Sequence, residues 1–216
     1  DILTANHQKT KRNYIERMTN DKVYCMNIAK KYQFDFWDGE RKFGYGGYKY
    51  IPGWWKESAQ NLINQYKLTT NSKILDIGCG KGFLLYEIQL LLPGIKITGV
   101  DSSEYAIKNI HSELIGEFYT QKAQEKFSYE DLYFDLVLST GTLHNLKIYD
   151  LKRAFLEIER LGRSKFIMVE SYRNDLEFFN LECWALTAQS LFAVDEWVWF
   201  FNEIGYTGDY EFIYFE

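Results

Sequence analysis

The chain of 216 residues lacks the marks of cross-linked, secreted or membrane-spanning proteins. Its three cysteines, at positions 25, 79 and 183, are odd in number, scattered, and free of CxxC or CxxH spacing. This pattern argues against a disulfide framework and a zinc site, and it is typical of a reducing compartment. No apolar run is long enough to span a bilayer and no signal peptide is visible, so we expect a cytoplasmic protein without a membrane partner.

Proline is also scarce, with two in the chain, and no glycine–serine linker or internal repeat interrupts the sequence. The length fits one domain with an appended arm. The net charge of −5 argues against nucleic acid as the main partner. Residues 1–31 nevertheless carry a net +4, so the other 185 residues carry −9. A basic arm could meet a phosphate-bearing substrate, although a solvated helical face explains the same pattern.

Strand-like and helix-like patterns alternate after residue 72. Strands are predicted at residues 73–77, 95–100, 117–120, 134–139, 165–171 and 210–215, and helices at 82–92, 104–114, 150–161 and 195–205. Gly162 stands where a helix C-cap is expected. The alternation predicts an α/β fold, a doubly wound and mostly parallel sheet spanning 73–216. Residues 1–72 are predicted to form a helical arm, with helices at roughly 8–31 and 54–67.

A glycine-rich loop, LDIGCGKGF, follows the first predicted strand. Gly78, Gly80 and Gly82 let the backbone pass close to a ligand, and the helix that follows offers free amides. The dinucleotide pattern GxGxxG would need glycine at position 83, where Phe83 stands. Asp101 ends the second strand, where a carboxylate can accept both hydroxyls of a ribose. The alternative role for Asp101 is an ordinary helix N-cap.

These segments together resemble the class I S-adenosylmethionine-dependent methyltransferases. The resemblance covers about residues 73–171 and is carried by KILDIGCGKGFLL, ITGVDSSEYAI, FDLVLSTGTLHNL and KFIMVES, in that order. It implies a Rossmann-like sheet, S-adenosylmethionine as the methyl donor, and methyltransferase activity. It does not indicate the methyl acceptor.

The resemblance also implies which residues contact the donor. Asp76 would orient the methionine end, Asp101 the ribose hydroxyls, and Ser102 would lie against the adenine edge. Lys122 and Ala123 stand where many relatives carry Asp-Ala, which leaves a backbone contact from Ala123 and puts the side-chain contact in doubt. The full expected donor-binding set is Tyr45, Tyr50, Asp76, Gly78, Cys79, Gly80, Asp101, Ser102, Ala123 and Ser139.

His144, in STGTLHNL after the fourth strand, is the candidate catalytic base. That loop flanks the donor's methyl group in the family, and a neutral imidazole accepts a proton near pH 7. The alternative is a structural histidine that caps a helix or bonds a nearby carbonyl. Tyr48, Asn145, Tyr172 and Arg173 are the expected acceptor-binding residues, although a surface salt bridge explains Arg173 equally well. No metal-ligand cluster is visible, and methyl transfer from a sulfonium demands no metal.

Residues 41–55, RKFGYGGYKYIPGWW, combine glycines with tyrosines and tryptophans. The segment resembles one found in small bacterial methyltransferases of surface-glycan and related small-molecule pathways. A segment that closes over the donor would shield it from water, and an aromatic face attracts a sulfonium. We therefore expect an aromatic–glycine lid in which Tyr45 or Tyr50 contacts the methionine end. The alternative is that the aromatics anchor the N-terminal helices, which we expect for Trp54 and Trp55.

The sequence thus predicts methyl transfer to a small molecule, such as a sugar, a sugar nucleotide or a phosphorylated metabolite. One alternative is an RNA or protein methyltransferase. The absence of a basic core face counts against RNA, and no Asn-Pro-Pro-Tyr-type motif follows the fourth strand. The other alternative is a non-catalytic donor-binding partner subunit, which the intact glycine loop and His144 make less favourable.

Overall fold

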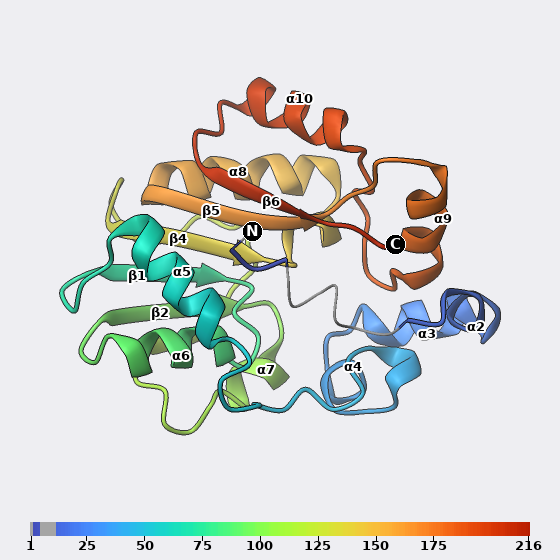
Figure 1. Cartoon of the computed structure of the whole chain (residues 1–216), viewed down its shortest axis with the longest axis horizontal. Helices are drawn as coiled ribbons and strands as arrows, with labels where there is room; N and C mark the ends of the chain where they lie inside the picture. Colours follow the sequence, from blue (N-terminus) through green and yellow to red (C-terminus); the bar gives the residue numbers. More distant parts are fainter. Residues whose placement is uncertain (1, 5–11) are drawn as a thin grey trace.

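The computed structural model of the chain describes residues 2–4 and 12–216. In this part of the chain the core is one six-stranded sheet, in the order β3-β2-β1-β4-β5-β6, with every neighbouring pair parallel (Figure 1). The strands are β1 Lys73–Ile77, β2 Lys96–Asp101, β3 Glu117–Thr120, β4 Phe134–Thr140, β5 Gly162–Glu170 and β6 Asp209–Ile213. The strand order reverses between β1 and β4, and sheets of this kind bind ligands beside such a switch point.

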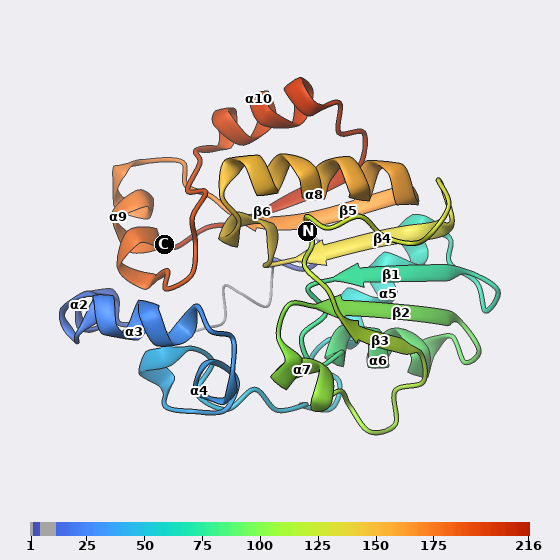
Figure 2. The same ribbon diagram turned by 180° about the vertical axis from the view of Figure 1, so that it is seen from behind.

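Helices pack on both faces of the sheet, because each strand is apolar on both sides. In β1, Ile74 packs in the cluster that α5 and α6 share, whereas its neighbour Leu75 packs with α8 and α10 (Figures 1 and 2). The predicted doubly wound α/β fold is confirmed. The described helices are α2 Tyr14–Thr19, α3 Lys22–Ala29, α4 Phe34–Trp37, α5 Lys56–Tyr66, α6 Phe83–Leu91, α7 Glu104–Lys108, α8 Ile148–Leu161, α9 Asp175–Trp184 and α10 Val194–Ile204, with 3₁₀ turns η1 Arg41–Phe43 and η2 Leu143–Asn145.

The N-terminal helices lie at the edge of the sheet where the strands end. Figure 2 shows α2, α3 and α4 beside the arrowheads of β1, β2 and β4, with α9 next to them. A small separate core joins α3 and η1 to the segment after α9, and it is formed by Cys25, Ala29, Phe43 and Leu186. Of the predicted helix at 8–31, residues 8–11 lie outside the described residues, and the rest divides into α2 and α3. The predicted division of the chain at residue 72 stays a prediction.

One local prediction is wrong for reasons of packing. The helix predicted at 104–114 ends at Lys108, because the chain then turns so that Leu114 packs over Gly82, where an added Cβ would lie 2.5 Å from Leu114 Cδ2. Gly162 is the C-cap of α8, as predicted, but its φ is −100° and not left-handed, because β5 begins there directly after α8. A Cβ at Gly162 would meet the carbonyl O of Ser164 at 2.7 Å, so close strand packing requires the glycine.

Helix α9 has no counterpart among the predicted helices, because its apolar residues lie on all sides rather than in one stripe. It begins at the N-cap Asn174, whose side chain accepts a hydrogen bond from the N–H of Glu177. Within residues 2–4 and 12–216, no helix is long and apolar enough to cross a bilayer.

Replacing Gly162 by alanine tests the packing explanation. Alanine tolerates the observed φ, so the cost should come from the crowded Cβ alone, about 1–3 kcal/mol of unfolding free energy. Urea denaturation of Gly162→Ala and of the exposed neighbour Arg163→Ala should show a loss only in the first variant. A Gly162→Ala variant as stable as the parent would contradict the explanation.

Candidate functional site

A cavity of about 530 Å³ opens at the carboxyl ends of the strands, at the switch point of the sheet. Its lining includes Gly78 after β1, Ser102 after β2, Ala123 after β3 and Gly141 after β4. Tyr45, the residues that directly follow α3, and part of α4 form the facing wall. Four strand ends and an N-terminal segment that is distant in sequence therefore meet around one cavity.

The glycine loop passes so close to β4 that no side chain fits at its first glycine. Gly78 has a φ of +87°, and a Cβ there would lie 1.9 Å from Oγ1 of Thr142. The N–H groups of Gly78 and Cys79 both donate to the carbonyl O of Val100, at 2.7 and 3.0 Å. The loop is thus held against β2, with the glycine surface at the cavity wall.

Asp101 joins this loop to the start of α7. It is buried, and its Oδ2 accepts a hydrogen bond from Gly80 N–H at 2.9 Å while Oδ1 accepts from Ser103 N–H at 2.8 Å. The N-cap of α7 is Ser103, whose side chain accepts from the N–H of Ala106. Asp101 is therefore not the N-cap, and its carboxylate oxygens retain lone pairs for further donors.

Asp76 is a buried carboxylate at the end of β1. Its Oδ1 has no hydrogen-bond partner among the described residues, and its side chain is 3% exposed. Burial, together with the charge of Asp101, raises the pKa of Asp76 to about 7. An unpaired buried carboxylate costs free energy, and a cationic or hydrogen-donating ligand group would relieve that cost.

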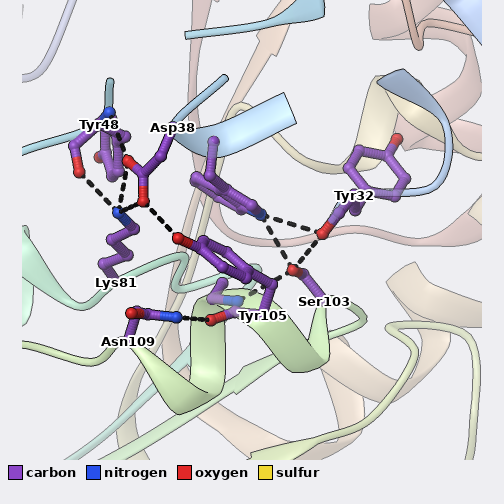
Figure 3. A network of polar contacts seen from close by, with 9 residues as sticks. Tyr32, Asp38, Tyr48, Lys81, Ser103, Tyr105 and Asn109 are labelled. Carbon is purple, nitrogen blue, oxygen red and sulfur yellow. Dashed lines mark hydrogen bonds and ion pairs between the residues drawn. The ribbon is translucent and has the colours of Figure 1, made fainter. Parts of the chain in front are cut away.

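A buried ion pair fastens the N-terminal segment onto the glycine loop. Lys81, which stands between Gly80 and Gly82, donates to both oxygens of Asp38, at 2.8 and 2.7 Å, and to the carbonyl O of Tyr48 at 2.9 Å (Figure 3). Burial acts to raise the pKa of Asp38, but hydrogen bonds from Lys81 and Tyr105 hold it below its usual range. We call residues 32–48, which this pair holds in place, the cover.

The cover is also tied to the end of β2 through its tryptophan. Nε1 of Trp37 donates to Oγ of Ser103 at 2.9 Å and to the carbonyl O of Tyr32 at 3.2 Å (Figure 3). The ring of Trp37 stacks on Tyr45, with centroids 5.3 Å apart, and would lie 3.1 Å from a Cβ placed on Gly80. The aromatic cover therefore rests directly on the glycine loop.

The three lid tyrosines have different positions. Tyr45 lines the cavity and is 46% exposed. Tyr48 stacks on Phe83 at the start of α6, with ring centroids 4.9 Å apart. Tyr50 lies outside the cavity lining, because its hydroxyl donates to Glu87 of α6 at 2.7 Å. The structure thus brings Tyr45, but not Tyr50, to the cavity.

His144 lies in η2 next to Glu170 at the end of β5. Its Nδ1 accepts a hydrogen bond from the N–H of Glu170 at 3.2 Å, so the proton of the neutral ring is on Nε2, which lies 3.4 Å from Oε2 of Glu170. Burial lowers the pKa of His144 to about 3 and raises the pKa of Glu170 to about 7. Neutral histidine and glutamate therefore form a pair whose titratable member near neutral pH is Glu170.

Asn145 follows His144 and has one unsatisfied oxygen. Its Nδ2 donates to the carbonyl oxygens of Gly141 and Thr142, at 3.3 and 3.0 Å, which fixes the orientation of the amide. Oδ1 is buried without a partner among the described residues. The side chain at this point of the cavity thus offers a free acceptor.

Of the predicted residues, Tyr45, Gly78, Asp101, Ser102, Ala123 and Asn145 line this cavity. Asp76, Gly80, Tyr48, Tyr50 and His144 lie outside its lining, and so do the four predicted residues that remain. Ser139 is fully buried and donates to the carbonyl O of Ile77 at 2.8 Å. Cys79 is also buried, and its thiol has a raised pKa because of burial. Tyr172 packs on Phe178 with centroids 4.5 Å apart, and Arg173 pairs with Glu177 and with Glu216 on the surface, as the salt-bridge alternative proposed.

Sequence reasoning missed three residues that shape the site: Asp38, Lys81 and Glu170. The sequence could have indicated a role for Lys81, because a lysine inside a tight glycine loop has little room to reach solvent. It could not have indicated roles for Asp38 and Glu170, since their partners lie 43 and 26 residues away in the chain. Within the described ranges, no group of three or more His, Cys, Asp or Glu side chains could hold a metal ion.

Comparisons with known proteins bear on the same segments. Residues 68–205 match the family described as methyltransferase domain. The chain is 33% identical over 132 residues to ribosomal RNA small subunit methyltransferase C of Buchnera aphidicola, covering 57% of this chain and 36% of that protein. It is 28% identical over 96 residues to protein-lysine N-methyltransferase EFM4 of Saccharomyces cerevisiae, covering 42% of each. The chain thus spans well under half the length of these two relatives.

Solved structures agree on the fold. YcgJ of Bacillus subtilis superposes with a TM-score of 0.55 at 18% identity, covering 68% of this chain and 66% of that one. A putative methyltransferase from an antibiotic biosynthesis pathway of Anabaena variabilis gives 0.53 at 22% identity, covering 68% and 59%.

The chain therefore belongs to the methyltransferase-domain family and has the class I S-adenosylmethionine-dependent methyltransferase fold, as its sequence predicts. S-adenosylmethionine is the methyl donor of this family. Two features of the site fit such a donor: the buried Oδ1 of Asp76, which has no partner among the described residues, and the side-chain-free backbone of Gly78 in the cavity wall.

The Lys81–Asp38 pair should be a major source of stability for the cover. Lys81→Met removes one partner and leaves Asp38 partly buried, so we expect a loss of about 2–4 kcal/mol of unfolding free energy. Lys108→Met breaks an exposed pair with Glu104 and should cost less than about 0.5 kcal/mol. Urea denaturation of both variants checks this, and equal losses would contradict it.

Asp76→Asn should stabilise the ligand-free protein while weakening donor binding. With its raised pKa, Asp76 costs stability as pH rises from about 4 through about 7, where the folded protein loses the proton. At about pH 8 the variant should therefore melt at a higher temperature than the parent, by roughly 2–4 °C for each kcal/mol of unfolding free energy gained. At about pH 4 the variant and the parent should melt at the same temperature.

Thermal melting of both proteins at the two pH values measures the first effect, and calorimetry with S-adenosylhomocysteine measures the second. A variant that melts lower than the parent at the higher pH would show that Asp76 has a stabilising partner.

Proposed function

We propose that this protein transfers a methyl group from S-adenosylmethionine to a small molecule in the cytoplasm. The observation that carries the proposal is the cavity of about 530 Å³ at the switch point, with the glycine loop on one side and the cover on the other. The donor supplies an activated methyl group on a sulfonium. The chain's own residues bind it, exclude water and accept the acceptor's proton.

The proposed donor contacts follow the positions of the side chains. Asp101 holds the ribose hydroxyls with the lone pairs that Gly80 and Ser103 leave free, and Asp76 orients the cationic methionine end. Ser102 and Ala123 lie along the adenine, and Tyr45 presents an aromatic face to the cavity. Roles for Tyr50, Cys79 and Ser139 in donor binding stay predictions, as do those of Tyr48, Tyr172 and Arg173 in acceptor binding.

The acceptor's proton passes to the His144–Glu170 pair. Glu170 is the member that takes it, because Nδ1 of His144 already accepts the N–H of Glu170 and Nε2 carries a proton. His144 then acts as a positioning residue that holds the carboxylate through Nε2–H. His144 as the base itself stays the competing prediction.

A small acceptor is favoured over a macromolecule by the cover. The Lys81–Asp38 pair and the Trp37 contacts hold it over the glycine loop, so the reacting group of an RNA or protein would have to enter beneath it. Residues 32–216 carry a net −9, which disfavours a nucleic-acid backbone. The relatives named for ribosomal RNA and for protein lysine keep those two acceptors as the alternatives.

Incubation with labelled donor decides between these acceptors. The protein is given nucleotide sugars and phosphorylated metabolites, total RNA, or a mixture of denatured proteins in separate reactions. We expect label in the small-molecule fraction. Label in RNA or protein alone would overturn the proposed acceptor class, and donor binding without turnover on any acceptor would favour a non-catalytic partner subunit.

The pH dependence of turnover tests the assignment of the base. If Glu170 takes the proton, it must be ionised, so kcat at saturating donor should rise between about pH 6 and about pH 8 with an apparent pKa near 7. A His144 base, whose pKa burial lowers to about 3, would give a flat profile over this range.

Glu170→Gln should lower kcat by roughly 10²- to 10⁴-fold and flatten the profile. His144→Ala should shift the apparent pKa rather than abolish the dependence. Affinity for S-adenosylhomocysteine is measured at each pH as the control, because the pKa of Asp76 is also raised to about 7.

A further inference from the structure

A second cavity, of about 250 Å³, lies next to the first. Phe36, Tyr45, Gly141 and Asn145 line both volumes, so the two cavities adjoin at these residues. The rest of its wall comes from the last turn of α2 and the chain before that helix, from η1, from η2, from the end of β5, from the end of α9 with the segment after it, and from Phe215. A molecule in the second cavity would thus face the contents of the first.

One wall of this cavity holds several cations around a single aromatic ring. The Cζ atoms of Arg17, Arg41 and Arg12 lie 4.8, 5.0 and 5.5 Å from the ring centroid of Trp184. We call these three arginines the arginine cluster. Lys22 lies close by, with its Nζ donating to the carbonyl O of Cys183 at 2.7 Å. The same wall therefore combines strong positive charge with a flat apolar surface.

The charges of Arg17 and Arg41 are not matched by carboxylates in the described part of the chain. Arg17 donates instead to the carbonyl O of Arg41 at 2.6 Å and of Trp184 at 3.4 Å, and Arg41 donates to the carbonyl O of Gly44. Burial and the charge of Arg41 lower the pKa of Arg17 to about 10, and burial and the charge of Arg17 lower the pKa of Lys22 to about 8. Glu170 lines the same cavity; burial raises its pKa, and the charges of Arg12 and Lys22 act to lower it. Arg17 and Arg41 are like charges held close together, so an anion bound beside them would be favourable.

We propose that the arginine cluster binds the phosphoryl group of the methyl acceptor, so that the second cavity is the acceptor site. This inference rests on the proposed function and names the substrate class for it: a small phosphorylated molecule. A guanidinium fork matches two phosphate oxygens at once, and two forks match a dianion. An acceptor held here by its phosphate extends past Asn145 and Glu170 toward the donor cavity.

The competing explanation is a structural clamp. Trp184 ends α9, and stacking of the arginines on its ring joins α2 and η1 to that helix. A clamp contributes to stability but has no saturable affinity for phosphate. Anion binding is therefore the readout that separates the two roles.

The experiment measures binding of inorganic phosphate and of pyrophosphate to the full chain by calorimetry. The test variant is Arg17→Gln/Arg41→Gln, and the matched control is Arg163→Gln, an exposed arginine at the opposite end of β5. We expect saturable binding to the parent and the control, and a Kd raised at least about 10-fold in the test variant. Arg41→Lys keeps the charge without the fork and should bind phosphate with intermediate affinity.

Three outcomes would overturn the proposal: no phosphate binding to the parent, unchanged phosphate binding in the double variant, or acetate bound as tightly as phosphate. An RNA oligonucleotide that displaces phosphate at a concentration far below that of pyrophosphate would overturn the small-molecule class. If the double variant melts at a much lower temperature than the parent, the phosphate affinity of Arg41→Lys is used instead. Unchanged affinity in that variant would overturn the proposal.

S-adenosylhomocysteine is titrated into every protein as well. Its affinity should agree within about 2-fold among them, because the arginine cluster lies outside the donor cavity. If the parent binds S-adenosylhomocysteine but not phosphate, the proposed acceptor site is wrong and the proposed function is unaffected. If the parent does not bind S-adenosylhomocysteine, the proposed function itself is wrong.

Discussion

The ion pair between Lys81 and Asp38 is the constraint on which the site depends. Lys81 sits in the glycine loop with 6% of its surface exposed, and moving an ammonium group out of water costs several kcal/mol unless it is paired. Its three donors are all used, by both oxygens of Asp38 and the carbonyl of Tyr48. Because these partners belong to the cover, burying this one lysine fixes the position of the aromatic segment over the glycine loop. Tyr45 belongs to the cover, so its place in the cavity wall depends on the same ion pair.

Charge is divided between the two sides of the site. Asp76, Asp101 and Glu170 lie at the carboxyl ends of β1, β2 and β5, so they are on the same edge of the sheet, and burial raises the pKa of each. The arginines of α2 and η1 line the second cavity together with Glu170. Carboxylates on the sheet and guanidinium groups on the helices give the site a polarity along which a donor with a cationic end and an acceptor with an anionic end would be oriented.

Much of the fold and part of the site could be predicted from the sequence, because both rest on local patterns. The run KILDI followed by IGCGKG predicts a buried strand and a tight turn from neighbouring residues alone, and Asp101 follows from its place at the end of the next strand. The end of α7 at Lys108 could not be predicted from local patterns, because it depends on the packing of Leu114 over Gly82. Arg173 shows the same limit, as its side chain pairs with Glu177 and Glu216 rather than entering either cavity.

The sequence by itself determined the doubly wound sheet, the glycine loop and the carboxylates at the strand ends. These depend on periodicity and on backbone freedom, which act within a few residues. Only the tertiary structure decided which charged and titratable side chains lie together: Lys81 with Asp38, Glu170 beside His144, and the arginines around Trp184. The free energy of a buried charge depends on what surrounds it in space, and residues tens of positions apart in the chain supply those surroundings.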